Sequence, residues 1–445
     1  MAGERTFSFW GMVGAVMLAL KLKDHIDDYR QVPDTEAGPV HLRSPMDENS
    51  PYHDDDDVAT LRGIDTEIPG ARPTKKRSRD CCLCCGMRCG LFWKAFGIVC
   101  ALVLGWQLIK LIIWAVTPSP TGLENMPQYS KSLGCENTKF HFGDDLNIYT
   151  LSLNAVKADH SIDFRGAAVG TLLIAEGDAE STSVKLELKV GTNDESLVPL
   201  VSVTYPDSND IEEGTADSRF LVSTPPHILS KTSCMRFDAT LFLPPNLKKL
   251  HVIAHATTQV RFDENANVDL DRLFVTLYPV DPNSMILPNT GIRAKEMDLE
   301  MARGWLVGDA SIVDRTTITT QRGDAVSNVK LHPVASSDGT SKALSVQTTT
   351  GAGRSDFFFI GHPSDPHRPI HAAHYSSRRG DIYLTYKDAE FSGTVDLQAS
   401  SYTATGVQGM SFNRTADSPL PWVGDQNGPD TLKVKTSGWA GLYFQ

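Results

Sequence analysis

The sequence lacks the short motifs that mark several common kinds of enzyme. It has no G-x-S-x-G nucleophile elbow, no P-loop, and no G-x-G-x-x-G that follows a strand. The string nearest to the first motif, Gly351-Ala-Gly353-Arg-Ser355, has the wrong spacing. Nothing here indicates a serine hydrolase or a nucleotide-dependent enzyme, so we expect no enzyme and no cofactor.

Apolar character and positive charge are also scarce over the chain as a whole. The mean hydropathy of -0.21 excludes a polytopic transporter. The 42 basic and 54 acidic residues give a net charge of -12, which argues against a general nucleic-acid binder. At about 150 residues per domain, 445 residues predict two or three segments.

One long apolar run, residues 95–116, predicts a transmembrane helix. As a helix its 22 residues would span roughly 33 Å, enough to cross a hydrocarbon core of about 30 Å. Phe92 and Trp93 at one end and Trp114 at the other are typical of membrane interfaces. Lys110 lies near the far end, where its side chain can snorkel outward. We therefore expect the lipid bilayer to be a partner.

The charges before this run predict its direction. Residues 1–70 carry 14 acidic and six basic side chains, whereas residues 71–94 carry seven basic and one acidic. Because basic residues stay on the cytoplasmic side, the amino terminus is predicted to be cytoplasmic and residues 117–445 extracellular or lumenal. This is a single-pass, type II topology. The basic residues taken to fix it include Lys75, Lys76, Arg77 and Arg79.

Six of the eight cysteines lie at or within the membrane segment. A Cys-rich cluster directly before a span resembles a site of S-palmitoylation. Plain interfacial thiols, or a zinc site built on Cys82, Cys85 and Cys89, are alternatives. Beyond the span, Cys135 and Cys234 predict a disulfide in an oxidising compartment. The candidate lipidation sites are Cys81, Cys82, Cys84, Cys85 and Cys89.

The segments around the span have distinct compositions. Residues 1–70 form an acidic arm of low apolar content that we expect to be mostly disordered. Within this arm, the apolar stretch 7–20 is short for a span, and we interpret it as interfacial or re-entering the membrane. Residues 71–94 are the juxtamembrane segment, and residues 117–135 form a stalk.

From about residue 136 the sequence has a period of two, which indicates strands. Residues 184–190 place four aliphatic side chains on one face and three charged side chains on the other. Turn residues recur every 8–15 positions, and no convincing helical pattern of ten or more residues follows the membrane run. We expect an all-β ectodomain whose first part, residues 136–285, is β-sandwich-like.

The second part, residues 286–445, contains an imperfect repeat of strand, glycine corner and strand. Self-similarity at roughly 20–30 residues is typical of stacked coils, so we expect a β-solenoid-like stack. We expect the corner glycines to supply positive φ, and Asp324 and Asp381 to be Asx-turn partners. The corner glycines are Gly304, Gly323, Gly351, Gly380 and Gly406.

Units of the form T-T-x-x-G-D-[AI], preceded by LPPNLKKLHV at residues 243–252, resemble the bacterial "putative adhesin" domains and their fungal relatives. The fungal relatives are uncharacterised single-pass membrane proteins with a basic, Cys-rich juxtamembrane segment. The resemblance covers about residues 240–410 and implies a β-solenoid-like stack with a role in adhesion. Inserts at 331–343 and 361–370 depart from the pattern.

Two histidine groups could ligate a metal, but their spacing argues against it. His371 and His374 are three residues apart, so on a strand they point to opposite faces. The other histidines of this group, His362 and His367, we take as ordinary loop residues. His251 and His255 share a strand face, and we interpret them as core or surface residues. We expect no metal site.

Carboxylates on a β-stack leave one enzymatic alternative open, a β-helix-type carbohydrate-active enzyme. Such an enzyme needs two carboxylates about 5–10 Å apart, and no aromatic-rich groove pattern accompanies the candidates. Asn413 begins the N-x-[ST] match and is a candidate glycosylation site on the outer side. The candidate carboxylates are Asp309, Asp324, Asp381 and Asp396.

The leading hypothesis is a non-enzymatic, membrane-anchored surface protein. Its ectodomain would act in adhesion, scaffolding or ligand display, with extracellular or lumenal proteins or glycans as ligands and no nucleic acid. The alternatives are the carbohydrate-active enzyme and a sorting or signalling adaptor that works through the cytosolic arm.

Overall fold

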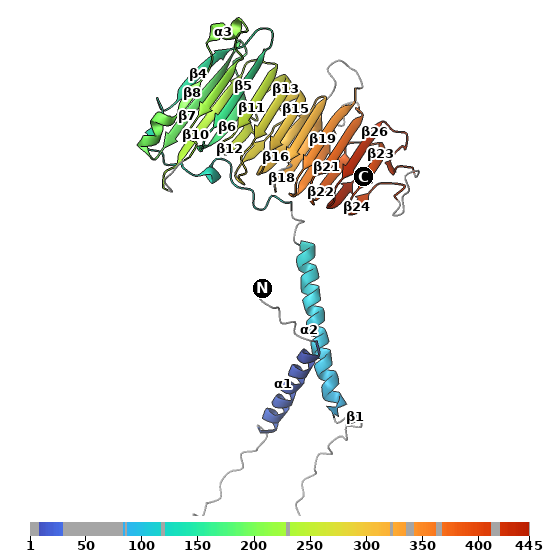
Figure 1. Ribbon diagram of the computed structural model, residues 1–445. Coiled ribbons are helices and arrows are strands. Elements are labelled where there is room, and N and C mark those ends of the chain that lie inside the picture. The colour runs from blue at the N-terminus through green and yellow to red at the C-terminus, as the bar shows by residue number, and fades with distance from the viewer. Residues whose placement is uncertain are drawn as a thin grey trace, which may run out of the picture. The chain divides into compact units, whose positions relative to one another are not determined.

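The computed structural model describes residues 9–29, 83–84, 87–116, 121–227, 232–320, 324–334, 342–361, 367–410 and 419–444. The chain divides into two compact units, which we call the helical unit, residues 1–119, and the β unit, residues 120–445. Figure 1 shows helices in the first unit and stacked strands in the second.

The helical unit contains the expected apolar helix. Helix α2 spans Cys89–Val116, and its part Phe92–Ile113 is, among the described residues, the one helix long and apolar enough to cross a membrane. Large apolar side chains on α2, such as Leu102 and Leu104, are exposed. A lipid environment would remove this apolar surface from water. Two short antiparallel strands, β1 (Leu83–Cys84) and β2 (Met87–Arg88), precede α2.

The apolar stretch 7–20 contributes to a longer helix than the sequence indicated. Helix α1 spans Phe9–Tyr29, because the polar residues after Leu20 continue the helix. Val13 of α1 is buried in one cluster with Ala95 and Val99 of α2. The stretch therefore packs along the first turns of α2.

Strands of the β unit form two large sheets in the described residues. The thirteen-stranded sheet consists of β3 (Phe140–His141), β4 (Asn147–Ser152), β6 (Val169–Glu176), β7 (Ser183–Thr192), β10 (Met235–Leu243), β12 (Thr258–Phe262), β14 (Met285–Leu287), β16 (Trp305–Ile312), β18 (Val326–Pro333), β20 (Ser355–Ile360), β22 (Ile382–Asp388), β24 (Ser401–Thr405) and β27 (Trp439–Tyr443). The twelve-stranded sheet consists of β5 (Asp159–Arg165), β8 (Ser202–Thr204), β9 (Arg219–Ser223), β11 (Lys249–Ala254), β13 (Val268–Leu277), β15 (Ile292–Met301), β17 (Arg315–Thr320), β19 (Leu344–Thr350), β21 (Ile370–Ser376), β23 (Gly393–Gln398), β25 (Trp422–Val423) and β26 (Asp430–Lys435).

From β10 to β24 the chain alternates between the two sheets, one strand in each. From β11 to β20, each strand therefore pairs in parallel with the strand two elements later, as β11 does with β13 and β13 with β15. Parallel pairing in register places like residues above one another. One inward ladder of the twelve-stranded sheet runs through Ile162, Val252, Val275, Leu299, Ile318, Thr348, His374 and Val434.

A single hydrophobic core lies between the sheets and extends from Leu151 to Phe444. Residues 136–285 and 286–445, expected as a sandwich-like and a stacked part, both contribute strands to the two sheets. They share this core because the sheets continue across residue 285. The expectation of an all-β region after the apolar helix is confirmed, with only the short helix α3 (Ser208–Glu212) and the 3₁₀ turns η1 (Lys131–Leu133) and η2 (Glu195–Leu200) among the described residues.

The corner glycines have two different roles. Gly304 has a φ of 129°, as expected for a corner that needs positive φ. Gly380 does not have positive φ; a Cβ there would lie 2.4 Å from the carbonyl oxygen of Gly351 in the preceding turn. Its neighbour Asp381 was expected to be an Asx-turn partner, but its carboxylate accepts a bond from the Trp439 backbone N–H in the next turn, at 3.1 Å. These corners are thus set by close stacking between turns.

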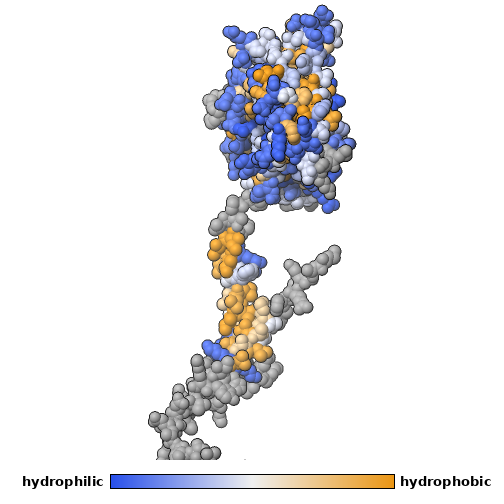
Figure 2. All heavy atoms as spheres, turned by 90° about the vertical axis from the view of Figure 1, so that its left-hand side faces the viewer, coloured by the Kyte–Doolittle hydropathy of each residue, from blue (hydrophilic) through white to orange (hydrophobic). Residues whose placement is uncertain are grey.

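The end of the β unit at β4 and β8 exposes apolar side chains. Ile148 of β4 is 58% exposed, and Leu200 of η2 is 58% exposed. Figure 2 shows an apolar patch surrounded by polar residues on this end. Tyr149 and Tyr205 pack against the buried Phe220 and close the core here.

Candidate functional site

The segment at the start of the β unit, which follows the apolar helix in the sequence, lies across the thirteen-stranded sheet. We call residues 121–139 the strap. The start of the strap lies beside Arg354, which directly precedes β20, and its middle lies beside Arg261 of β12. Its end reaches Thr192 of β7. The strands from β20 to β7 number eight in the sheet order, so the strap runs transverse to them over about 34 Å at about 4.8 Å per strand. Figure 1 shows this segment in teal along the sheet.

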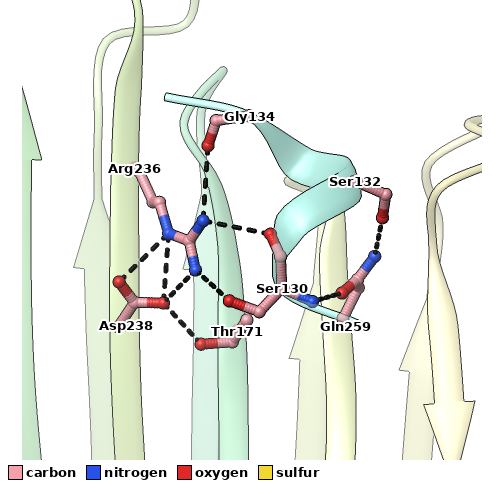
Figure 3. A network of polar contacts seen from close by, with 7 residues as sticks. All are labelled: Ser130, Ser132, Gly134, Thr171, Arg236, Asp238 and Gln259. Carbon is pink, nitrogen blue, oxygen red and sulfur yellow. Dashed lines mark hydrogen bonds and ion pairs between the residues drawn. The ribbon is translucent and has the colours of Figure 1, made fainter. Parts of the chain in front are cut away.

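Arg236 of β10 holds the strap through its guanidinium group (Figure 3). Nη1 donates to the carbonyl oxygens of Ser130 and Gly134, at 3.0 and 3.3 Å. Nη2 donates to the Ser130 hydroxyl at 2.5 Å and to Asp238 at 2.8 Å, while Nε faces both oxygens of Asp238. The Arg236 side chain is only 9% exposed, and a buried guanidinium is stable only when its donors are paired. The strap therefore supplies acceptors that Arg236 needs.

Gln259 of β12 is a second polar anchor, and it is fully buried. Its side-chain oxygen accepts from the Ser130 backbone N–H at 2.5 Å, and its nitrogen donates to the Ser132 hydroxyl at 2.9 Å. Ser130 has a φ of 69°, which is unusual for a residue with a Cβ and costs free energy. Bonds from Arg236 and Gln259 to the same residue offset this strain, as Figure 3 shows.

A disulfide fixes the end of the strap. Cys135 is bonded to Cys234, which directly precedes β10, and the two residues are 99 positions apart. In the chain-entropy account, closing a loop of this length stabilises the folded state by about 4–5 kcal/mol. The disulfide and Arg236 thus join the strap to the start of the same strand, β10.

Arg354 forms a similar fork near the start of the strap. It donates from Nε and Nη2 to the two oxygens of Asp356, at 2.7 and 2.8 Å, and its guanidinium lies 3.9 Å from the ring centre of Tyr383. A Cβ on Gly122 would lie 2.9 Å from the Arg354 side chain, so the strap passes closely here. The pKa of Arg354 is raised, mainly by the hydrogen bond to Asp356 and in part by the charge of Glu124 in the strap.

Sequence reasoning missed both forks. Each is an Arg-x-Asp triplet, Arg236-Phe-Asp238 and Arg354-Ser-Asp356, at the start of a strand. Residues two apart on a strand share a face, so this triplet predicts a local ion pair. The pairing with a strap more than 100 residues earlier gives no local signal in the sequence.

Three neighbouring hollows lie beside the strap. Hollow A, about 390 Å³, is bordered by Tyr129, Leu146 and Arg261, and hollow B, about 440 Å³, by Cys135, Glu136 and Arg236. Both are lined by Lys189 and Asp238. Hollow C, about 490 Å³, shares His141 with hollow B. We call the three hollows together the groove.

Burial raises the pKa of Tyr129 at the rim of hollow A, while the charge of Arg261 opposes the shift. The phenol therefore stays neutral and can bond to Thr171 of β6 below it. Lys189 of β7 is exposed, and its side chain makes no ion pair or hydrogen bond with any residue that the structure describes. Its ammonium group is thus available to a ligand.

The candidate metal-binding histidines are dispersed. His374 is buried, contacts Thr348 and Tyr386 at 2.8 and 3.3 Å, and burial lowers its pKa to about 3. His371, on the other face of β21, contacts Thr431 at 2.9 Å. No group of three possible ligands occurs in the described ranges. The remaining candidates are His367, beside Asp430, and His251 and His255, which stack on Phe274 and Tyr278, while His362 lies outside the described residues.

The candidate catalytic carboxylates have separate settings. Asp309 of β16 lies 2.7 Å from His332 on the thirteen-stranded sheet, whereas Asp396 of β23 belongs to the other sheet. Asp381 binds a backbone N–H, and Asp324 is exposed. The pair needed for glycoside hydrolysis is therefore not assembled by Asp309 and Asp396.

Several predicted sites fall outside the described residues. These are Cys81, Cys82 and Cys85, the orientation residues Lys75, Lys76, Arg77 and Arg79, and Asn413. Cys84 lies in β1, and Cys89 begins α2. Lipidation, orientation and glycosylation stay predictions.

No family model and no curated protein matches this chain. Similar solved structures include a "putative cell adhesion protein" from Clostridium sporogenes, with 9% identity and a TM-score of 0.17, which covers 67% of this chain and 100% of that one. A "putative adhesin" from Bacteroides fragilis has 12% identity and a TM-score of 0.31, with coverage of 67% and 98%. A "putative adhesin" from Parabacteroides merdae has 12% identity and a TM-score of 0.20, with coverage of 54% and 93%. At TM-scores this low, these likenesses carry no argument about the chain's activity.

Proposed function

We propose that this protein is a single-pass membrane protein whose β unit is a non-enzymatic binding platform on the outer or lumenal side. The β unit would be a solenoid-like stack that displays ligand-binding surface in adhesion or scaffolding. The amino-terminal arm would be cytoplasmic.

The strap is the observation that carries this proposal. It follows a helix suited to a membrane within a few residues, and it is attached to the sheet by Arg236, Gln259 and a disulfide. A pull on the membrane tether would therefore enter the sheet through several bonds across neighbouring strands. An anchor of this kind fits a protein that bears load while it holds a ligand.

Two physical arguments support the orientation. The disulfide between Cys135 and Cys234 forms and persists in oxidising compartments, outside the cytosol. The basic residues before the span favour the cytoplasmic side. Both support a β unit on the side of the membrane away from the cytosol.

A topology and adhesion experiment tests the proposal. Cells would produce the full chain with a tag at each end, and protease would be added to intact cells or sealed vesicles. We expect the amino-terminal tag to be on the cytosolic side, and cells that carry the protein to resist detachment by flow more than cells without it.

A deletion of residues 121–445 that keeps both tags and the helical unit is the matched control. A cytosolic carboxy-terminal tag would contradict the orientation. Equal detachment of full-length and control cells from coats of protein and of polysaccharide would contradict the platform function.

A further inference from the structure

The groove beside the strap has the dimensions and the polarity of a ligand site. Each hollow falls within the usual range of ligand pockets, about 300–1,000 Å³. Hollow A shares Lys189 and Asp238 with hollow B, and hollow B shares His141 with hollow C, so the three lie next to one another. A row of adjacent hollows suits an extended ligand made of several units.

Charges of both signs line hollows A and B. Hollow A is lined by Glu187 and Asp238 and by Lys189 and Arg261, two acidic and two basic side chains. Hollow B has the same balance, with Glu136 and Asp238 against Lys189 and Arg236. An anionic or cationic ligand would meet a like charge in either hollow, so a neutral ligand is favoured.

Hydroxyl groups satisfy such a lining. A hydroxyl donates one hydrogen bond and accepts others, so one group can donate to Asp238 while it accepts from Lys189. These two residues face each other in register on β10 and β7. Bonds to charged partners are the stronger hydrogen bonds, which compensates for the open shape of the groove.

Hollow A also offers apolar surface of modest size. Leu146 is 49% exposed at its border, and Leu173 and Tyr129 line it. The C–H face of a sugar ring can cover such a surface while its hydroxyls reach the charged groups. A peptide is disfavoured, because β10 in the floor already pairs with β6 and β7 on both sides and leaves no strand edge for an added strand.

We propose that the groove binds a neutral, linear glycan, with one sugar unit in hollow A and the next in hollow B. This inference rests on the proposed platform function and names its ligand class. Lys189 is the residue through which it is best tested, because it lines both hollows and has no partner among the described residues.

The experiment uses the full-length protein in lipid nanodiscs and four probes. Laminarihexaose, chitohexaose and mannohexaose are the neutral probes, and a heparin hexasaccharide is the anionic probe. We expect at least one neutral probe to bind and the anionic probe to bind more weakly. Lys189→Met should weaken binding of the neutral probe at least tenfold.

Lys433→Met is the matched control, since Lys433 is also an exposed strand lysine but lies on β26 in the other sheet. It should leave affinity within about twofold. Binding of none of the neutral probes, preference for heparin, or equal affinity of the Lys189→Met protein would each overturn the assignment. If cells still resist flow in those cases, the platform function stands and only the groove fails; if they do not, both fail.

Discussion

The two Arg-x-Asp forks beneath the strap share an ion pair between the arginine and the aspartate, but their burial is opposite. In the first half of the β unit, the Arg236 side chain is 9% exposed and Asp238 is 46% exposed. In the second half, Arg354 is 24% exposed and Asp356 is 5% exposed. The same triplet thus buries its cation at one end of the strap and its anion at the other.

This difference has a physical reason in what each end of the strap provides. Near Arg236 the strap offers the carbonyl oxygens of Ser130 and Gly134, which stabilise a buried cation. Near Arg354 it offers the close passage of Gly122. Arg354 instead covers the ring of Tyr383 and leaves Asp356 beneath it, so burial raises the pKa of Asp356 despite its charged partner.

The first half also has the covalent attachment, and its loss should have the largest effect. Replacing Cys135 and Cys234 by Ser together should lower the free energy of unfolding by about 4–5 kcal/mol, because the unfolded chain gains the entropy of a loop of 99 residues. Urea denaturation of the full-length protein in detergent measures this. Cys100→Ser is the control, as Cys100 is unpaired in α2. A loss similar to that of the control would show that the noncovalent anchors alone hold the strap.

The disulfide and the strands could be predicted from the sequence, but the polar anchors of the strap could not. Two lone cysteines beyond the span and the period-two pattern of residues 184–190 are local signals, and β7 is found there. The anchors at Arg236 and Gln259 depend on which strand lies beneath which turn of the strap. That is set by the stacking order of the sheets, with contacts up to 129 residues apart, so no local pattern reports it.

Acid should weaken both halves through one buried histidine in each. Burial lowers the pKa of His160 in β5 and of His374 in β21 to about 3. Between about pH 6.5 and 3 the unfolded chain binds more protons than the folded one, so stability falls as pH falls. From pH 7 to pH 5 we expect a loss of about 2 kcal/mol per histidine, or about 4 kcal/mol in total.

Single replacements would divide this pH effect between the halves. His160→Gln and His374→Gln should each remove about half of the dependence between pH 7 and pH 5, measured as the change in urea midpoint. His160 has an unpaired ring nitrogen, whereas both nitrogens of His374 have partners, so the first replacement should disturb neutral-pH stability less. An undiminished pH dependence in both variants would assign it to other groups.

Protein stability should depend strongly on the bonds between Arg236, the buried cation, and the strap. Arg236→Ala removes the donors that bond to Ser130, Gly134 and Asp238. We expect the free energy of unfolding to fall by about 2–3 kcal/mol, a figure that already allows for the exposure of Asp238. Arg236→Lys keeps the charge but not the planar guanidinium group, so its stability should lie between that of the wild-type protein and that of Arg236→Ala. Faster proteolysis within the strap should accompany the loss, and a change below about 0.5 kcal/mol would contradict the anchor role.

The opposite burial of the two carboxylates predicts opposite responses to the same conservative change. Asp238→Asn leaves the buried Arg236 without a counter-charge and should cost about 1–2 kcal/mol at pH 7. Asp356→Asn replaces a carboxylate that is buried and whose pKa is raised, so ionisation at neutral pH already costs stability there; the amide should change stability by less than about 1 kcal/mol.

Lowering the pH through the raised pKa of Asp356 stabilises the folded wild-type protein relative to the Asn variant, because the folded state then binds the extra proton. Urea titrations of the wild-type protein and both variants, at pH 7 and at steps of lower pH, measure the difference. Equal losses of stability in the two variants would contradict this prediction. They would mean that the opposite burial of the two forks has no energetic consequence.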